Sequence, residues 1–218
     1  MSDVVTFELL HADQAQRSVN DVALVAPTDV RVRPGRGVVL RGPNGAGKST
    51  MLRMMTGAAL PSSGTVTLDG KKVDERVPRV REVIAALLWP ITGYRELTVQ
   101  DHLVLVDQTW GGQRETCADR VNAMFDLLDI EPLRHRFLHE LSSGQRQLAD
   151  LAMTLIRPSG VLVLDEPEQR LDSDRRAQLA RILLARKQAG AALLVACHDE
   201  SVIEVIADDT VTLTPVPL

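Results

Sequence analysis

Aromatic side chains are scarce in this sequence, since Phe, Tyr and Trp together make up 3% of its 218 residues. The core must therefore be filled mainly by Leu, Val, Ile, Ala and Met. Hydrophobic residues still account for 44% of the chain and charged residues for 25%, which is ordinary for a soluble globular protein. The length suits one compact domain, so we expect a single domain with at most a subdomain.

Cysteines and surplus basic residues are few as well. The two cysteines, Cys117 and Cys197, form no CxxC pair and lie near no histidine cluster. We expect two buried, reduced thiols rather than a disulfide or a metal site. The net charge is -4, and because neutralising phosphates requires clustered Lys and Arg, we expect no nucleic-acid partner.

Long hydrophobic runs are also missing. The longest runs, Val83–Pro90 and Ala189–Cys197, are less than half of what a bilayer span requires. The first residues, MSDVVTFELLHAD, lack the basic region and the continuous apolar segment of a signal peptide. We therefore expect a cytoplasmic chain that reaches a membrane only through a partner.

Short aliphatic runs alternate with helical patterns along the chain. Strands are predicted at Val38–Arg41, Val161–Leu164 and Ala191–Cys197, and turn residues predict a hairpin or edge strand within Ser62–Val73. Helices are predicted at Ser49–Leu60, Thr116–Ile130, Gln145–Ile156 and around Leu179–Leu183. This alternation predicts an α/β fold with a mainly parallel sheet and helices on both faces. Because Arg95–Glu140 has no strand pattern, we expect a helical subdomain there.

A glycine-rich segment follows the first predicted strand and opens the first predicted helix. It fits the pattern G-x-x-x-x-G-K-[ST] with Gly42, Pro43, Asn44, Gly45, Ala46, Gly47, Lys48, Ser49 and Thr50. Such a loop points backbone N–H groups at one spot, where the helix N-terminus adds partial positive charge. Lys48 can bridge the β- and γ-phosphates of a nucleoside triphosphate, and Ser49 can ligate Mg²⁺. A chance match arises about once in a hundred such chains, and the flanking elements favour a true phosphate loop.

Two further strand ends carry candidate catalytic groups. Asp165 and Glu166 follow a buried strand, and ligands of open α/β sheets bind beyond the carboxyl ends of strands. Asp165 can hold Mg²⁺ through water and Glu166 can polarise the attacking water, whereas the structural alternative is a solvated acidic turn. His198 follows another buried strand. A lone histidine there is more often structural, but the shared sheet edge places it near the γ-phosphate.

The segment Leu141-Ser-Ser-Gly-Gln145 lies 20 residues before Asp165 and opens a predicted helix. A plain N-cap by Ser142 or Ser143 is the structural interpretation. However, the phosphate loop, LSSGQ, VLVLDEP, Leu171-Asp172 and His198, in this order and spacing, resemble the ATP-binding subunits of ABC transporters. The resemblance covers nearly the whole chain.

The resemblance implies a P-loop NTPase core with an antiparallel β edge, formed by about residues 1–90 and 157–218, and an inserted helical subdomain of about residues 91–156. Two such domains would hold two ATP molecules and Mg²⁺ head to tail. Each ATP would meet the opposite protomer through Ser142, Ser143, Gly144, Gln145 and Asp172, with Ser142 and Gly144 on the γ-phosphate. The catalytic residues would be Lys48, Glu166 as general base, and His198. The remaining partner would be a membrane-spanning permease, which would hold the chain at the inner face of the membrane.

The sequence also departs from the family pattern. Trp89 stands where members usually carry a glutamine, and an indole cannot ligate Mg²⁺ or orient water as an amide can. Ser143 replaces a glycine, and residues 168–170 (Glu-Gln-Arg) bring bulk and charge to the predicted interface.

The aromatic residue that commonly stacks on adenine is missing. The usual spacing before Lys48 leads to Val19, with His11 and Arg17 as weaker substitutes. We therefore expect poor discrimination between ATP and GTP.

The leading hypothesis is the ATP-hydrolysing subunit of a transporter, more of the exporter type because the chain is short. A soluble ATPase of the same superfamily is the alternative, although the 92 residues from Thr50 to Ser142 leave no room for the coiled coil of chromosome-type members. A third hypothesis is a weakly active half of a heterodimer. Trp89, Tyr94 and Leu97–Leu105 lie where the family docks its membrane partner, and simple core packing is the alternative for them.

Overall fold

A five-stranded parallel sheet forms the centre of the molecule in the computed structural model, which describes residues 4–20 and 22–216. Its order is β6-β7-β8-β3-β9 and every neighbouring pair is parallel. The strands are β3 (Gly37–Arg41), β6 (Ile84–Leu87), β7 (Val161–Asp165), β8 (Ala192–Ala196) and β9 (Asp209–Thr212). Because β7 and β8 are buried on both faces, they are continuous aliphatic runs.

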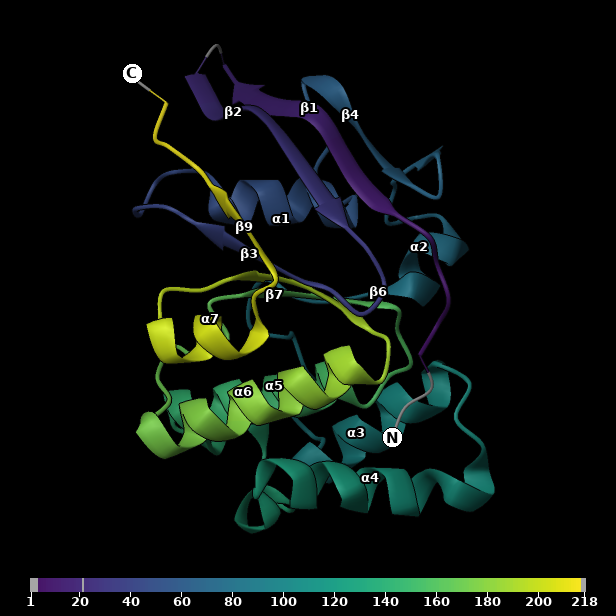
Figure 1. Cartoon of the computed structure of the whole chain (residues 1–218). Coiled ribbons are helices and arrows are strands. Elements are labelled where there is room, and N and C mark those ends of the chain that lie inside the picture. The colour runs from purple at the N-terminus through teal and green to yellow at the C-terminus, as the bar shows by residue number, and fades with distance from the viewer. Residues whose placement is uncertain (1–3, 21, 217–218) are drawn as a thin grey trace.

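A second sheet, antiparallel and four-stranded, lies above the first and has the order β2-β1-β4-β5 (Figure 1). It consists of β1 (Leu10–Val19), β2 (Val22–Val32), β4 (Ser63–Leu68) and β5 (Lys71–Lys72). The predicted hairpin in Ser62–Val73 is confirmed, with Asp69 and Gly70 turning between β4 and β5 at φ 51° and 76°. The antiparallel edge expected from the sequence is thus a separate sheet.

Helix α1 (Lys48–Thr56) fills the space between the two sheets (Figure 1). Its Met51, Leu52 and Met55 are fully buried in an apolar cluster that takes residues from both sheets. The helix ends four residues before the predicted Leu60, because Gly57 adopts φ 80° and caps it.

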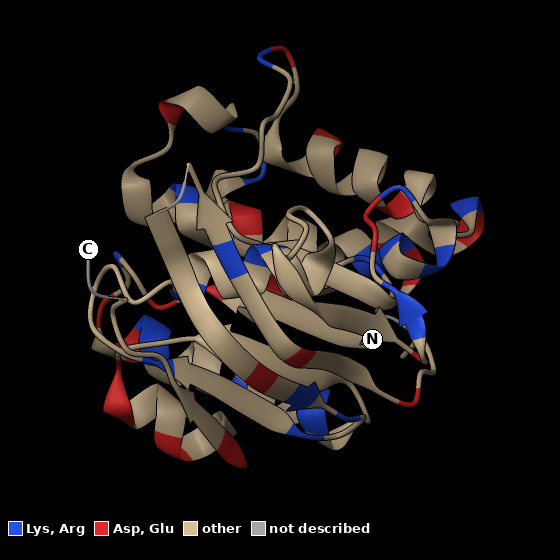
Figure 2. Ribbon diagram, turned by 90° about the horizontal axis from the view of Figure 1, so that it is seen from above, with Lys and Arg blue, Asp and Glu red and all other residues tan. Residues whose placement is uncertain are grey.

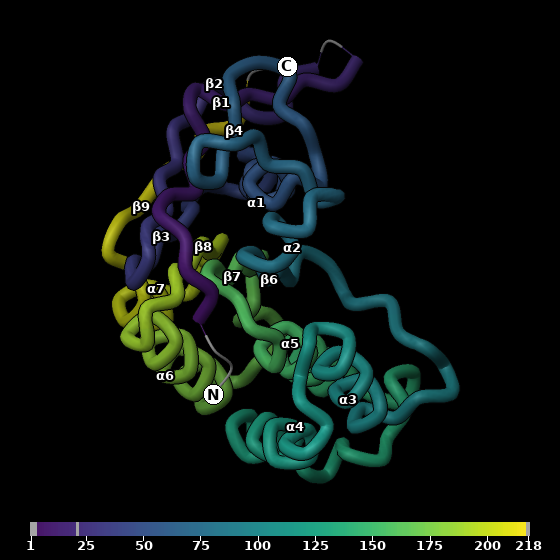
Figure 3. Tube along the Cα trace, turned by 90° about the vertical axis from the view of Figure 1, so that its right-hand side faces the viewer, coloured from purple at the N-terminus to yellow at the C-terminus, as the bar shows by residue number. Residues whose placement is uncertain are grey.

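The other face of the parallel sheet is covered by helices. The helices on the sheet are α5 (Ser143–Leu155), α6 (Ser173–Gln188) and α7 (Glu200–Ile206). Helices α3 (Val99–Thr109) and α4 (Arg114–Leu128) pack on α5, and α2 (Pro78–Val83) precedes β6. Two 3-10 turns, Glu131–Leu133 and Leu138–Glu140, link α4 to α5. Figure 3 shows α3 and α4 at the end of the molecule opposite the antiparallel sheet.

The helices α3 to α5 share one apolar cluster with α6, α7 and the parallel sheet. A buried ion pair ties α3 to α4, with Arg120 Nε 2.6 Å from Asp107 Oδ1, and the arginine lowers the pKa of that carboxyl. The boundaries of a helical subdomain at about residues 91–156 stay a prediction, since the apolar cluster is continuous across them.

The structure also bears on the expectations about cysteines, surface charge and membrane spans. Cys117 and Cys197 are both free and buried, as predicted. Basic and acidic residues are interspersed over the face seen from above (Figure 2). In the described part of the chain, none of the helices combines the length and apolarity needed to cross a bilayer.

Candidate functional site

The glycine-rich loop connects β3 to the N-terminus of α1, as predicted. Gly47 adopts φ 90°, and a Cβ on it would lie 2.4 Å from the Leu24 carbonyl oxygen, so only glycine fits where the loop packs against β2. The Lys48 side chain is 5% exposed, and its Nζ donates to the carbonyls of Gly42 and Pro43 at 2.8 and 3.2 Å. The loop therefore holds a cation beside the positive end of a helix, which is an anion-binding arrangement.

A cavity of about 660 Å³ opens beside this loop. Its lining unites loop residues with a residue from the end of β7: Asn44, Gly45, Gly47, Lys48, Ser49, Thr50 and Glu166, with Val22, Ala23, Leu24 and Val216 completing the wall. The fold thus brings together two predicted motifs that are more than a hundred residues apart in the sequence. Gly42, Pro43 and Ala46 shape the loop from outside this lining.

The cavity wall that completes this lining is aliphatic. It is formed by Val22–Leu24 of β2 and by Val216. Val19, His11 and Arg17, the positions to which the family spacing leads, are not in the lining of this cavity, and their contact with a base stays a prediction. All three belong to β1, whereas the loop packs on β2, the edge strand of its sheet.

Asp165 ends β7 close to Ser49, whose hydroxyl acts to lower the pKa of the carboxyl. Both residues line a smaller cavity of about 220 Å³, together with Glu166. Asp165 Oδ1 is buried and has no hydrogen-bond partner among the described residues. Burial raises the pKa of the Asp165 carboxyl, and Glu166 adds to the rise. A hydroxyl beside an unpaired carboxylate oxygen is a donor set that fits Mg²⁺.

Glu166 has a backbone conformation that is rare for a residue with a side chain. Its φ is 48°, and its N–H donates to the Ala196 carbonyl at 2.8 Å. Such strain costs about 1–3 kcal/mol and persists only where the surroundings enforce it. The result is a carboxylate that lines both cavities.

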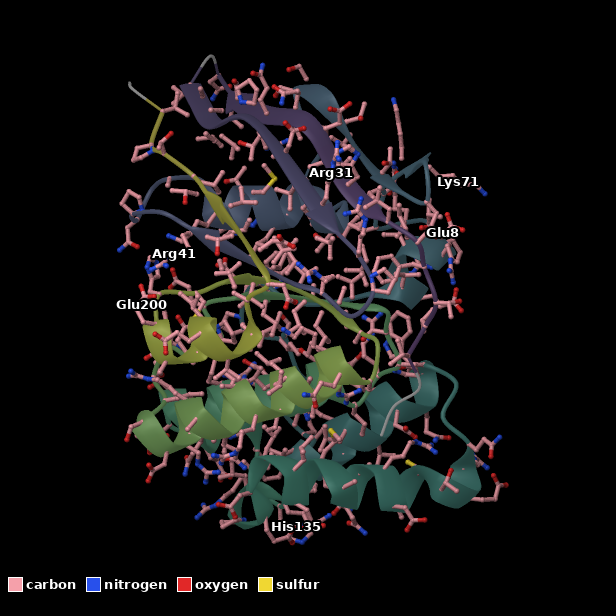
Figure 4. The ribbon with its side chains drawn as sticks, viewed as in Figure 1. Glu8, Arg31, Arg41, Lys71, His135 and Glu200 are labelled. Atoms are coloured by element: carbon pink, nitrogen blue, oxygen red, sulfur yellow. The ribbon has the colours of Figure 1, made fainter. Side chains whose placement is uncertain are left out.

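His198 follows β8 and lies beside Glu166, with its Nε2 3.2 Å from Glu166 Oε1. The adjoining helix α7 is fastened to the end of β3 by an ion pair between Glu200 and Arg41, which lie side by side in Figure 4. The ends of β3, β7 and β8 therefore supply the loop, the two acids and the histidine at one sheet edge, as the sequence predicted.

The LSSGQ segment is not part of this cavity within the described chain. Ser142 caps α5 and forms a reciprocal capping box with Gln145, at 3.3 Å and 2.9 Å. Ser143 is the exposed first residue of the helix, and Asp172 caps α6 by accepting from Arg175 N at 2.9 Å. The N-cap expected at Ser142 or Ser143 is Ser142, and the contacts of Ser142–Gln145 and Asp172 with a nucleotide stay predictions.

Two amides in the smaller cavity were missed by sequence reasoning. Gln147 and Gln169 line it together with Trp89, and Gln147 Nε2 donates to the Pro167 carbonyl at 3.2 Å. The available signal was the spacing of Gln147 from Asp150, two polar residues on the buried side of an amphipathic helix. The residues nearest the end of β6, Leu88 and Trp89, carry no amide.

We predict that Asp165→Asn raises Tm at pH 7 by about 2–4 °C, because removing an unpaired buried charge recovers roughly 1 kcal/mol. Because the folded-state pKa of Asp165 lies above the ordinary value, the free energy of unfolding of the wild type falls as the pH rises above the ordinary carboxyl range. The advantage of the variant should therefore vanish below about pH 4 and grow as the pH rises. Thermal melts across pH test this, with exposed Asp119→Asn as control; an advantage that is largest in acid contradicts the assignment.

Comparison with known proteins places this geometry in a family. The family model described as ABC transporter matches residues 25–169. The sn-glycerol-3-phosphate import ATP-binding protein of Paraburkholderia xenovorans is 35% identical over 174 residues, which are 79% of this chain and 48% of that protein. The Nod factor export ATP-binding protein I of Cupriavidus metallidurans is 29% identical over 190 residues, 87% of this chain and 63% of that protein. The chain thus spans about half the length of the curated relatives it matches.

Solved structures agree on the fold. An ATP-binding subunit of an ABC transporter superposes with a TM-score of 0.84 at 24% identity, covering 95% of this chain and 86% of that one. A second, described as the dimeric structure of a bacterial ABC transporter cassette, gives 0.83 at 20% identity, covering 95% and 94%. The predicted α/β P-loop fold is confirmed. This chain belongs to the ABC transporter family, as a nucleotide-binding domain.

Proposed function

We propose that this chain binds ATP and hydrolyses it to drive a membrane-spanning partner. The observation that carries the proposal is the cavity in which the phosphate loop, Lys48 and Glu166 face the same space. Backbone amides at the start of α1 and the Lys48 ammonium neutralise a triphosphate. Ser49 and Asp165 would hold Mg²⁺, which, when bound, neutralises charge on the phosphate oxygens.

Glu166 is the proposed general base. Its carboxylate lines the cavity and can accept a proton from a water molecule directed at the γ-phosphate. His198 holds that carboxylate through the 3.2 Å contact from Nε2 to Oε1. The positive φ of Glu166 turns the chain directly after β7 and leaves the carboxylate in the lining of the cavity.

A second copy of a nucleotide-binding domain is the other proposed partner. Ser142–Gln145 and Asp172 stay outside the cavity of their own chain, and one similar structure is described as dimeric. Gly144 has the Arg170 carbonyl oxygen only 2.8 Å from the place of a Cβ, so this segment packs tightly on residues 167–172. Both segments would face the opposite nucleotide together.

The direction of transport expected from the sequence gains no support from the relatives. Several relatives are named for import, of glycerol phosphate, iron, spermidine and maltose, and one is named for transport of lactose. Another is named for export of Nod factor. We therefore propose a transport ATPase without assigning a direction or a substrate.

The docking surface for the permease is proposed at a third cavity of about 410 Å³, between α1, α2 and α3. Both tryptophans of the chain, Trp89 and Trp110, line it, and Trp89 is 51% exposed, which argues against core packing. The Arg157 guanidinium lies 3.6 Å from the Trp110 ring centre, and its Nε is buried without a hydrogen-bond partner in the described chain. Burial lowers the pKa of Arg157 to about 10. Arg157 therefore holds Trp110 at the wall of this cavity.

We predict that Glu166→Gln binds Mg–ATP, dimerises and loses at least about 100-fold in kcat, because the amide cannot accept the proton. The exposed Glu204→Gln is the matched control and should retain wild-type turnover. ATPase assays and size-exclusion chromatography with ATP test both. Wild-type turnover in Glu166→Gln would mean that the base has been misassigned, and slow turnover in the wild type would favour the regulatory half-site hypothesis.

We predict that ATP and GTP bind with affinities within about tenfold of each other, because an aliphatic wall offers no ring to stack on and no base-specific side-chain hydrogen bond. Calorimetric titration of both nucleotides measures this. A hundredfold preference for ATP would contradict the role given to Val22–Leu24.

We predict that the wild-type protein sediments with inverted membrane vesicles from its source cells, and that Trp89→Ala and Arg157→Gln each weaken this binding about tenfold. Glu204→Gln again serves as the control. Equal sedimentation of all variants would move the docking surface elsewhere. No sedimentation of the wild type would favour the soluble ATPase.

A further inference from the structure

Glu168 does not face solvent or a partner, contrary to the expectation from the sequence. Its neighbours Gln169 and Arg170 are exposed, but Glu168 itself is only 5% exposed. A glutamate this deeply buried is unusual unless it is paired with a cation. Among the residues that the structure describes, no lysine, arginine or histidine forms an ion pair with it.

The contacts of Glu168 lead to His198. Glu168 Oε1 accepts a hydrogen bond from the backbone N–H of His198 at 2.8 Å. The Cys197 thiol is also within hydrogen-bonding reach; burial raises its pKa, and the Glu168 carboxylate raises it further. Glu168 Oε2 is buried and has no hydrogen-bond partner within the described ranges.

The free energy gained from these contacts is smaller than the cost of burying a carboxylate. A hydrogen bond to a charged group contributes about 1.5–3 kcal/mol, whereas withdrawing an unpaired ion from water costs several kcal/mol. An apolar side chain at this position would remove the cost of burying the charge. What the carboxylate supplies, and an apolar group cannot, is a fixed acceptor for one particular peptide N–H.

That N–H belongs to the residue whose ring contacts the proposed base. Glu166 meets the imidazole of His198 at 3.2 Å, and Glu168, two residues later on the same turn, holds the backbone of the same histidine. On the far side, Asp199 is fixed by Arg176 at 2.8 Å. The backbone around His198 is therefore held from both directions, and in this position its ring lies 3.2 Å from the Glu166 carboxylate.

We propose that Glu168 is a positioning residue for ATP hydrolysis, which sets the His198 imidazole against the Glu166 carboxylate through the His198 backbone. The proposal rests on the proposed function. Glu168 touches neither nucleotide nor water in this account, so its removal should affect turnover and leave nucleotide affinity unchanged.

The test compares Glu168→Leu, Glu168→Gln and the exposed control Glu204→Leu. Glu168→Leu should lower kcat about 10- to 100-fold, as expected for a misplaced catalytic group, with KM for ATP within about twofold of the wild type. Its Tm should equal or exceed that of the wild type, because a buried charge has been removed. Glu168→Gln keeps an oxygen acceptor and should retain kcat within about threefold. Glu204→Leu should match the wild type.

Wild-type kcat in Glu168→Leu, or equal losses in Glu168→Leu and Glu168→Gln, overturns the proposal. If Glu168→Leu does not fold, the amide proton of His198 decides: in ¹H–¹⁵N spectra it should lie downfield in the wild type and move upfield in Glu168→Gln. An unmoved resonance also overturns the proposal. A wild type without any ATPase activity instead contradicts the proposed function, and the amide resonance still tests the Glu168–His198 contact.

Discussion

The site depends on one topological constraint: parallel strands that share a sheet end at the same edge. β3, β8 and β7 are consecutive neighbours, so the residues that follow them are brought together although they lie far apart in the sequence. The phosphate loop follows β3, the Asp165–Glu166 pair follows β7 and His198 follows β8. The N-terminus of α1 then provides a fixed dipole at the point where these ends meet. None of these groups could form the site alone.

The same edge concentrates groups that reduce the stability of the fold. Asp165 has a buried oxygen without a partner, Glu166 has a positive φ, and Glu168 is a carboxylate buried beside a backbone N–H. Their surroundings, two apolar clusters on opposite faces of the parallel sheet, are dense enough to enforce these positions. Groups that lower the stability of the fold, held in place by dense packing around them, are expected at a functional site.

The sequence predicted the elements whose pattern has one physical explanation. β7 and β8 are buried on both faces, and the phosphate loop has a fixed geometry, so the two strands and the loop could be predicted from the sequence. β1 and β2 were missed because they mix polar and small residues, contain register shifts and are half exposed. The aliphatic wall of the larger cavity and the inward turn of Glu168 were missed because both depend on which strand or turn packs against the loop, and local patterns do not encode that choice.

The proposed function requires that backbone amides at one helix N-terminus and Lys48 bind the triphosphate of a nucleotide. Calorimetric titration of Mg–ATP into the wild type and into Lys48→Ala, in the presence of a dimerising excess of protein, measures this directly. We expect one nucleotide per chain for the wild type and at least about 100-fold weaker binding for Lys48→Ala, since a charge-assisted contact with the phosphates is lost. No heat of binding from the wild type, or equal affinity for both proteins, would contradict it.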